Sequence, residues 1–435
     1  MRLSPTRRSA RARWITFGSV LILAVSTGGW LLRRKPAADG NVYQQARLFE
    51  TVVGAIHAHY LDSIGEGDLY QRASAALVGS LHDPYAELLL RDSYREYQRQ
   101  MSGTEIEVGA IIGGFGDGRE PGIAPGDEVV SVDGHNTRGW SPDRIRSALE
   151  GGDGPRVRVV LRPRGSDRLV SRELTRTELH VPATSHGVLL GGGIGYLALH
   201  RVSDGASDEL RTSVQRLRDL GMRSLILDLR LNPGGLISEG VRIAGLFLHP
   251  GDTVATSLGR GEQHSKVYLA GLPGGWSDMP VTLLVNRGTA SSAELIAAAL
   301  QDHDRAAVIG TPTFGKGVLQ TTYPLADEVA LKLTTARWFT PQGRNIQRPR
   351  PDSTGSEGNR PPAFDARVFR SDAGRPLPAA SGVVPDLIIR STPRREGEVA
   401  LLAALGSDAS IFRAEVSAFA GDLTLRSKRP LMITP

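Results

Sequence analysis

Apolar residues recur at two different spacings along the chain, and the change of spacing divides it into segments. Residues 43–102 carry apolar positions four residues apart, which predicts amphipathic helices. Residues 103–178 contain runs such as 156–161, where charged and apolar residues alternate as in a half-buried strand. The chain is therefore predicted to have an N-terminal helical region followed by a small β-rich module.

Turn and capping residues add one helix and one tight turn to the β-rich module. Ser141 is a good N-cap for a helix over residues 142–149. Asp133-Gly134 follows the apolar run 129–132 and predicts a tight turn. The module thus combines several short strands with one helix.

Residues 180–390 alternate two kinds of apolar pattern. Short continuous apolar runs predict buried strands, and longer runs with helical spacing predict helices between them. Such alternation is typical of an α/β core. The predicted strands are 194–199, 224–229, 281–285, 308–309 and 330–334, and the predicted helices are 206–220, 238–248 and 291–303. Residues 349–382 predict a loop, and residues 391–435 form a C-terminal extension.

Residues 1–35 predict a cytoplasmic tail and a membrane anchor. The 19 residues of 14–32 carry no charge, and about 20 apolar residues span a bilayer as a helix. Basic residues flank this run, and the heavier cluster precedes it, which places the rest of the chain outside the cytoplasm. We expect a single-pass protein of the inner (cytoplasmic) membrane whose main part lies on the extracytoplasmic, periplasmic side. A signal peptide cleaved near Ala37 and Ala38 is the alternative.

The net charge of +6 belongs to the N-terminus. Residues 1–35 hold eight Arg and Lys and no Asp or Glu, so residues 36–435 carry a net charge of −2. No basic stripe with interleaved aromatic residues follows, and we expect no nucleic-acid partner. Cysteine is absent and the 10 His show no H-E-x-x-H spacing. The sequence therefore excludes thiolate chemistry and predicts neither a metal site nor a cofactor.

The first candidate for chemistry is Ser291, at the junction between the buried run 281–285 and the predicted helix 291–303. A helix N-terminus offers free N–H groups and a dipole that stabilise developing negative charge. A plain N-cap serine is the alternative, and by itself it is the commoner reason for Ser at such a place.

The second candidate is Lys316, which lies between two glycines in an apolar setting. The chain uses Arg for 47 of its 52 basic residues, so a lysine here suggests a role that Arg cannot fill. A buried lysine can lose its proton and act as a base, whereas Arg stays protonated. A loop lysine without such a role is the alternative. The lysines are Lys35, Lys266, Lys316, Lys332 and Lys428.

The third candidate is the turn at Gly234-Gly235, which follows the buried run 224–229. Such a turn can present backbone N–H groups to an oxyanion. A turn that needs glycine only for its backbone conformation is an equal alternative.

Together these segments resemble the carboxyl-terminal processing proteases, the Ser–Lys peptidases of family S41 with an embedded PDZ domain. The usual motifs of that family are D-x-R-x-N-P-G-G, G-S/T-A-S-A-S-E and F-G-K-G-x-x-Q, in this order. The resemblance covers about residues 45–390, and the interval of 25 residues between Ser291 and Lys316 fits it. The matching residues are Asp228, Arg230, Asn232 to Gly235, Gly288 to Ser291, Glu294, Phe314 to Gly317 and Gln320.

The resemblance implies a crotonase-like α/β protease core built of ββα units, with a PDZ-like module inserted near its N-terminal side. It implies that Ser291 attacks a peptide carbonyl while neutral Lys316 accepts the proton, and that Gln320 holds the lysine amine. The implied activity is endopeptidase cleavage of proteins or peptides near their C-termini, without a cofactor. The implied oxyanion hole consists of backbone N–H groups of Gly234 or Gly235 and of Ser292.

Two features depart from the family pattern. Residues 291–294 read Ser-Ser-Ala-Glu where the family usually has Ser-Ala-Ser-Glu, which leaves Ser292 as a second candidate nucleophile. The PDZ-like stretch, residues 103–178, is shortened between Ala110 and Gly122, so we expect its peptide-binding groove to be reshaped.

Two functions of other classes remain as alternatives. One is a noncatalytic PDZ-bearing scaffold at the membrane, against which the intact Ser291, Lys316 and Gln320 argue. The other is an acyl-CoA enzyme on the same core fold, against which the anchor and the PDZ-like module argue. The sequence leaves open whether the helical region, residues 43–102, forms a homodimer and whether a regulatory adaptor binds the protein.

Overall fold

A computed structural model describes most of the chain beyond residue 41. The predicted anchor, residues 14–32, and the shortened stretch between Ala110 and Gly122 lie outside the described residues. None of the described helices is long and apolar enough to cross a membrane. The described residues are 42–108, 123, 127–152, 154–163, 165–271, 275–326, 328–348, 368–379, 381–389 and 395–406, with 412, 415, 416 and 419.

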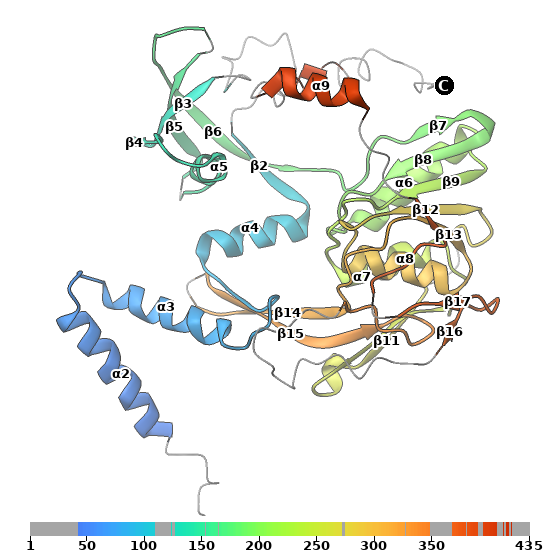
Figure 1. Ribbon diagram of the computed structural model, residues 1–435, viewed down its shortest axis with the longest axis horizontal. Coiled ribbons are helices and arrows are strands. Elements are labelled where there is room, and N and C mark those ends of the chain that lie inside the picture. Colours follow the sequence, from blue (N-terminus) through green and yellow to red (C-terminus); the bar gives the residue numbers. More distant parts are fainter. Residues whose placement is uncertain are drawn as a thin grey trace, which may run out of the picture. The chain divides into compact units, whose positions relative to one another are not determined.

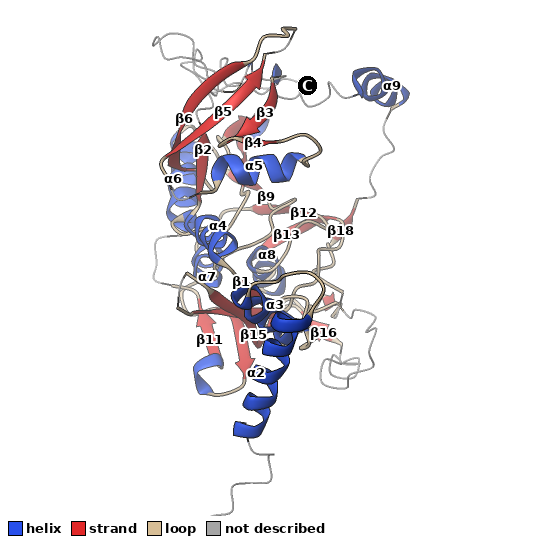
Figure 2. Cartoon of the chain, turned by 90° about the vertical axis from the view of Figure 1, so that its left-hand side faces the viewer, coloured by secondary structure: helices blue, strands red, loops and turns tan. Residues whose placement is uncertain are grey.

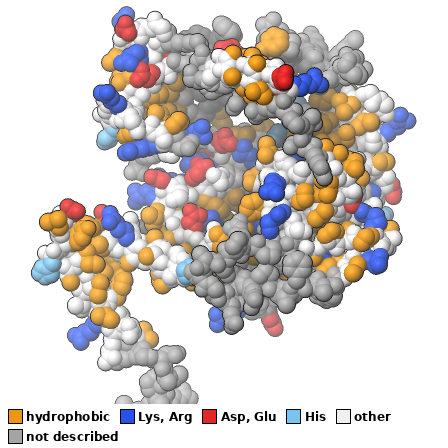
Figure 3. All heavy atoms as spheres, viewed as in Figure 1, with side chains coloured by type: hydrophobic (Ala, Val, Ile, Leu, Met, Phe, Trp, Pro, Cys, Tyr) orange, Lys and Arg blue, Asp and Glu red, His pale blue; other side chains and the backbone are white. Residues whose placement is uncertain are grey.

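The structure divides the chain into two compact units, residues 1–81 and 82–435. The boundary falls inside the predicted helical region, 43–102. The described part of the first unit is a pair of helices, α2 (Val42–His59) and α3 (Glu66–Gly79). They meet through Phe49 and Tyr70, whose ring centroids are 5.9 Å apart. Exposed apolar side chains of this unit include Leu48, Val52, Ile56 and Leu77. Hydrophobic side chains are visible on the surface of these two helices (Figure 3).

The small β module of the second unit is a five-stranded antiparallel sheet with one helix. Val157, Val159 and Leu161 from one strand are almost fully buried, and the predicted alternation is confirmed. The predicted helix is confirmed too, because Ser141 accepts a hydrogen bond from the Arg144 N–H at 3.2 Å. The strand order is β2-β6-β5-β3-β4. The elements are β2 (Thr104–Val108), β3 (Glu128–Val132), β4 (His135–Asn136), α5 (Pro142–Glu150), β5 (Arg156–Arg162) and β6 (Val170–His180).

The central sheet of the second unit has six strands in the order β18-β13-β12-β9-β8-β7. All neighbours pair in parallel except β7, which is antiparallel to β8. Leu227, Leu283 and Val308 from three adjacent strands are fully buried, so these strands appear in the sequence as continuous apolar runs. The strands are β7 (Val188–Leu190), β8 (Ile194–Ala198), β9 (Ser224–Asp228), β12 (Val281–Val285), β13 (Ala306–Gly310) and β18 (Leu387–Ile388).

The second sheet of this unit is antiparallel, and the sequence predicts only the first half of one of its strands. β15 pairs with β1 and β10 along one side and with β14 along the other. β14 therefore lies at an edge of this sheet within the described residues. The strands are β1 (Glu87–Leu89), β10 (Thr253–Gly259), β11 (Lys266–Leu269), β14 (Val318–Pro324) and β15 (Ala330–Phe339).

Helices α7 and α8 lie between the two sheets, as two views of the chain show (Figures 1 and 2). Every residue of α8 is buried, which its run of Ala, Leu and Ile permits. α6 packs against β8 and α7. The three predicted helices are confirmed, although α7 ends at Gly245 rather than at residue 248. The helices are α6 (Ala206–Asp219), α7 (Ile237–Gly245) and α8 (Ser292–Asp302).

Short elements complete the described chain. They are α4 (Arg91–Ser102), η1 (Gly191–Gly193), η2 (Glu262–His264), β16 (Phe369–Arg370), β17 (Pro376–Leu377) and α9 (Glu396–Leu405).

A buried ion pair ties the end of α8 to the loop that follows β15. Arg344 and Asp302 are both fully buried, and the guanidinium donates to the carboxylate. Arg344 also donates to the Pro378 carbonyl at 2.9 Å and to the Gln301 side-chain oxygen at 3.1 Å. The loop that Arg344 holds carries Gln347, which accepts a hydrogen bond from the Gly317 N–H at 2.9 Å. The ion pair therefore supports the segment next to Lys316.

Arg344→Met is expected to lower the free energy of unfolding by about 3–5 kcal/mol, because it leaves the Asp302 carboxylate buried without its cation. Urea denaturation of the purified protein measures this change. Arg156→Met removes the same type of side chain from an exposed pair with Glu173, and we expect it to cost less than about 1 kcal/mol. Equal costs for the two variants would contradict the structural role of Arg344.

Candidate active site

Ser291 occupies a strained position between β12 and α8. Its φ of 55° and ψ of −122° place a residue with a Cβ in a conformation that such residues rarely adopt. It is the N-cap of α8, as predicted, and it remains 8% exposed. A serine on a sharp strand-to-helix turn is the geometry by which some hydrolases present a nucleophile. The observed strain therefore favours a functional role over a plain N-cap.

Ser292 points into the interface between α7 and α8. It is fully buried, and its Cβ would lie 3.0 Å from a Cβ placed on Gly240 of α7. Its hydroxyl has no hydrogen-bond partner among the described residues. The two adjacent serines thus have different surroundings, and Ser291 is the one on the strained turn.

The Glu294 carboxylate joins the serine turn to the lysine loop. Its Oε2 accepts hydrogen bonds from the backbone N–H of Ser291 at 3.0 Å and of Lys316 at 2.8 Å. Its Oε1 accepts from the Gly315 N–H at 2.6 Å and from the Thr313 hydroxyl. Ser291 and Lys316, 25 residues apart in sequence, are therefore attached to one oxygen atom.

Glu294 is fully buried, and this affects its ionisation. Burial raises the pKa of the Glu294 carboxyl, while its four hydrogen-bond donors oppose that rise by stabilising the carboxylate. Three of these donors are backbone N–H groups, which cannot accept a proton in return. Both loops must keep their positions for this buried carboxylate to remain satisfied.

The loop around Lys316 is held on several sides. The indole N–H of Trp338 donates to the Lys316 carbonyl at 3.1 Å, and the Trp338 backbone N–H donates to the Gly317 carbonyl at 3.0 Å. The Lys316 amine lies 4.8 Å from the ring centroid of Tyr85. A ring face attracts the charged form of an amine, so this contact favours the ammonium over the neutral base.

Gln320 lies on β14, just after an irregularity in its pairing with β15. Its Nε2 is buried and has no hydrogen-bond partner among the described residues. The structure therefore places this predicted site residue near the lysine loop in the chain, with an amide group that is available for a further contact.

The glycine turn after β9 contacts the serine turn. A Cβ on Gly234 would lie 2.9 Å from both the Ser291 Cβ and the Ser292 nitrogen, so only glycine allows this approach. The Gly234 N–H donates to the Asn232 side chain at 2.9 Å. Of the two predicted alternatives, the Gly234 N–H is thus already engaged, whereas the Gly235 N–H has no acceptor among the described residues.

Gly235 is required for a second reason. Its φ is 150°, and a Cβ there would lie 2.3 Å from the Val202 carbonyl oxygen. Asn232 holds the same turn against the residue that follows β8, because its side-chain amide donates to the Leu199 carbonyl at 2.8 Å. Its carbonyl also accepts from the Ala290 N–H at 2.9 Å, which links the glycine turn to the residue before Ser291.

Asp228 and Arg230 form a clamp at the end of β9. Arg230 donates to Asp228 from its backbone N–H and from its guanidinium, and the Tyr196 hydroxyl donates at 2.8 Å. Burial alone would raise the pKa of Asp228, but Arg230 and Tyr196 hold it below its usual range. Leu231, which follows, has a φ of 63° and is 74% exposed, a conformation that costs energy for a leucine. The clamp thus supports a second strained residue beside the serine turn.

His303, the histidine nearest to Ser291 in sequence, cannot serve as its base. It follows the far end of α8, about 18 Å from Ser291 at 1.5 Å per residue. Its two ring nitrogens contact the Thr253 carbonyl and the Asp372 carboxylate, each at 2.8 Å. Burial would lower the pKa of His303, yet these two acceptors raise it. Both ring nitrogens of His303 are therefore occupied by these contacts, and neither is available to Ser291.

The sequence identified the serine, the lysine and the glycine turn but missed the residues that connect them. Glu294 and Asn232 matched motifs without an assigned role, and Thr313 gave no signal. Their partners are distant in sequence, so no local spacing marks them. The described residues contain no group of three His, Asp or Glu that could hold a metal ion.

A strained serine on a strand-to-helix turn of a mixed α/β fold is the arrangement of a serine hydrolase. Comparison with known proteins narrows this class. The profile of "Peptidase family S41" matches residues 193–354, the segment that holds the glycine turn, the serine turn and the lysine loop. The matched segment belongs to this family of serine peptidases.

Named relatives agree with this assignment. A "Probable CtpA-like serine protease" of Staphylococcus haemolyticus (strain JCSC1435) is 30% identical over 316 residues, which are 70% of this chain and 63% of the relative. The protein of the same name in Staphylococcus aureus (strain MSSA476) is 29% identical over 361 residues, which are 78% of this chain and 72% of the relative. A solved "photosystem II D1 C-terminal processing protease" is 24% identical, with a TM-score of 0.43 over 80% of this chain and 89% of that one.

Glu294→Gln is expected to lower activity by about 100-fold or more while the protein still folds. A glutamine replaces one acceptor oxygen with an NH₂ group, which faces backbone N–H donors, so at least one loop loses its bond. A displacement of about 1 Å at a catalytic group is enough for a loss of this size. Peptidase assays and circular dichroism of the purified variant measure the two effects.

Glu239→Gln is the matched control. Glu239 is equally buried, but its carboxylate binds the Ser207 N–H and the Arg242 guanidinium, away from both loops. We expect a similar loss of stability without the loss of activity below the melting temperature. If both variants lost activity equally, Glu294 would have no special role in the site.

Proposed function

We propose that this protein is a membrane-anchored, extracytoplasmic serine endopeptidase of the carboxyl-terminal processing type, with Ser291 as nucleophile and Lys316 as general base. One observation carries the proposal: a single carboxylate oxygen of Glu294 binds the backbone of both residues. Membership of peptidase family S41 supports the same reaction class. Its substrates are proteins or peptides cleaved near their C-termini.

Acylation begins when the Ser291 hydroxyl attacks a peptide carbonyl and its proton passes to the Lys316 amine. The carbonyl oxygen becomes an oxyanion, and the backbone N–H groups of Gly235 and Ser292 stabilise its charge. The protonated lysine then delivers the proton to the leaving amine, and the C–N bond breaks. Water hydrolyses the acyl-enzyme by the same route in reverse.

Lys316 must leave the Tyr85 ring, or lose its proton in place, to act as a base. We assign support of this step to Gln320, whose buried Nε2 has no hydrogen-bond partner among the described residues and could contact the lysine amine or the substrate. A substrate that excludes water from the lysine would oppose this effect of the Tyr85 ring and favour the neutral form. Binding of substrate would therefore increase the fraction of Lys316 that is neutral and can accept a proton.

The finer fold assignment is part of this proposal. The core would be crotonase-like, which the two sheets enclosing α7 and α8 support. The module of β2 to β6 with α5 would be PDZ-like, which its antiparallel order and single helix support. A PDZ domain binds an extended C-terminus by strand addition, and we expect the shortening between Ala110 and Gly122 to make such binding weak or absent here.

Ser291→Ala is expected to abolish cleavage of an unfolded test protein, a loss of about 10⁶-fold or as far as the assay can follow. Ser292→Ala should retain activity and at least the original stability, because it removes a buried hydroxyl that has no partner among the described residues. Gel-based cleavage assays and thermal melting give both readouts. If the Ser291→Ala variant were active and the Ser292→Ala variant inactive, the nucleophile would be Ser292 instead of Ser291.

Lys316→Arg and Lys316→Ala are both expected to be inactive with the fold intact by circular dichroism. Arginine keeps the charge but stays protonated, so it cannot accept the serine proton. Wild-type activity should rise with pH as the neutral fraction of the lysine grows, since a free lysine has a pKa near 10.4. Substantial activity of the arginine variant would remove Lys316 from the role of base.

The membrane proposal rests on residues 14–32 and their basic flanks. We expect the native protein to stay with the membrane on alkaline carbonate extraction and residues 36–435 to be accessible to protease from the extracytoplasmic side. Release into the soluble fraction, with a new N-terminus near residue 39, would indicate a cleaved signal peptide.

A further inference from the structure

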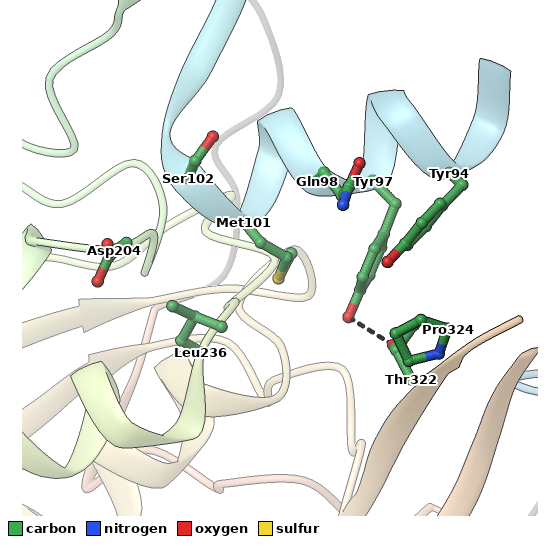
Figure 4. Close-up of a pocket in the computed structure, with 9 residues that line it drawn as sticks. All are labelled: Tyr94, Tyr97, Gln98, Met101, Ser102, Asp204, Leu236, Thr322 and Pro324. Carbon is green, nitrogen blue, oxygen red and sulfur yellow. Dashed lines mark hydrogen bonds between the residues drawn. The ribbon is translucent and has the colours of Figure 1, made fainter. Parts of the chain in front are cut away.

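A pocket of about 360 Å³ lies between α4, the turn that follows Gly235 and the end of β14. Tyr94, Tyr97 and Met101 extend from α4 into this space, with Leu236 on one side and Pro324 on the other (Figure 4). The Thr322 hydroxyl donates to the Tyr97 hydroxyl at 3.1 Å and fixes one wall. The Asp204 N–H donates to the Met101 carbonyl at 2.8 Å and fixes the end of α4. The pocket is therefore held by hydrogen bonds at both ends.

The lining of this pocket suits a large apolar side chain. Met101, Leu236, Pro324 and two tyrosine rings supply apolar walls, and burial of one such side chain contributes about 1.5–3 kcal/mol. Asp204 is the one charged group among its described lining residues. A second carboxylate next to it would be both desolvated and repelled, so the pocket should disfavour acidic side chains.

Two elements that line the pocket also carry residues of the proposed active site. Leu236 directly follows Gly235, the residue assigned to the oxyanion. Thr322 lies two residues after Gln320 on β14, and side chains two apart on a strand share one face of the sheet. A chain that reaches Ser291 therefore has this pocket within a few residues of its cleaved bond.

The face of β14 and β15 that carries Gln320 also has two buried polar side-chain atoms. Gln320 Nε2 and Thr334 Oγ1 have no hydrogen-bond partner among the described residues, and the two residues are directly opposite each other on β14 and β15. Buried polar groups are nearly always hydrogen-bonded, so these two side chains would gain partners if they turned toward a ligand when it binds. The amide and carbonyl groups of a peptide backbone would supply those partners.

We propose that this pocket is a specificity subsite that binds one large apolar side chain of the substrate polypeptide, whose backbone passes over Gln320 and Thr334. The subsite rests on the proposed peptidase function and adds its substrate class: chains with an apolar residue, and no acidic one, at a fixed distance from the cleaved bond. An extended chain that crosses this face would direct every second side chain to the same side, so that one of them could enter the pocket.

Gln98→Trp tests the subsite by filling it. Gln98 lines the pocket but is exposed on α4, so an indole there should occupy the space without disturbing the core. We expect KM for peptides with a matching Leu to rise about 10-fold or more, with kcat nearly unchanged. Gln100→Trp, on the same helix and also exposed but outside the pocket, should change neither constant.

Asp204→Asn tests the exclusion of acidic side chains. A positional set of short fluorescein-labelled peptides, each with Leu or Glu at one position in turn, should reveal one position where Leu is preferred over Glu. The variant should reduce that preference about 10-fold or more, chiefly by improving the Glu peptides, while the Leu peptides change little. An unchanged preference would assign the discrimination to another part of the protein.

Binding to the Ser291→Ala protein separates this proposal from the peptidase proposal. Fluorescence anisotropy with the same peptides needs no catalysis, and Gln98→Trp in that background should weaken Leu peptides about 10-fold or more. Equal binding with Trp at position 98 or 100 would overturn the subsite even if the enzyme cleaves normally. If the wild type cleaved nothing while peptide binding still depended on residue 98, the peptidase proposal would be wrong and the subsite proposal would stand. A lower kcat at unchanged KM for Gln98→Trp would mean distortion and would also reject it.

Discussion

The Glu294 carboxylate is the interaction on which the rest of the site depends. It lies inside a fully buried helix and binds the serine turn and the lysine loop at the same time. Without its partners, a buried carboxylate costs several kcal/mol, so the two loops are ordered together or not at all. The relative positions of Ser291 and Lys316, the proposed nucleophile and base, are therefore set by a residue that has no role in the proposed chemistry.

The buried position of α8 explains how this carboxylate can be so well placed. Two sheets and α7 enclose the helix, and its other end is tied to the loop after β15 through Arg344 and Asp302. That loop in turn binds Gly317, next to the lysine. The helix thus fixes the site from both of its ends, and the strain at Ser291 is maintained by packing that cannot relax locally.

The parallel strands, their helices and the small module follow from the sequence, because short buried runs and helical spacing are local signals. Most of the second sheet does not. β14 mixes Thr, Gln and Tyr with few apolar residues, since one face of it borders a pocket and its outer edge has no strand partner among the described residues. The sequence placed Gln320 in a motif, but it did not predict the strand that carries Gln320 or the pairing of Gln320 with Thr334.

The sequence by itself determined the family, the candidate nucleophile and base, and the need for glycine at the turn, because those features depend on residue type and spacing within short segments. Only the tertiary structure decided which serine lies on the strained turn, that the Gly234 N–H is already used by Asn232, and that the His303 ring contacts the Thr253 carbonyl. Such facts depend on contacts between residues far apart in the chain. Hydrogen bonds and packing, not spacing, select among the alternatives that the sequence leaves open.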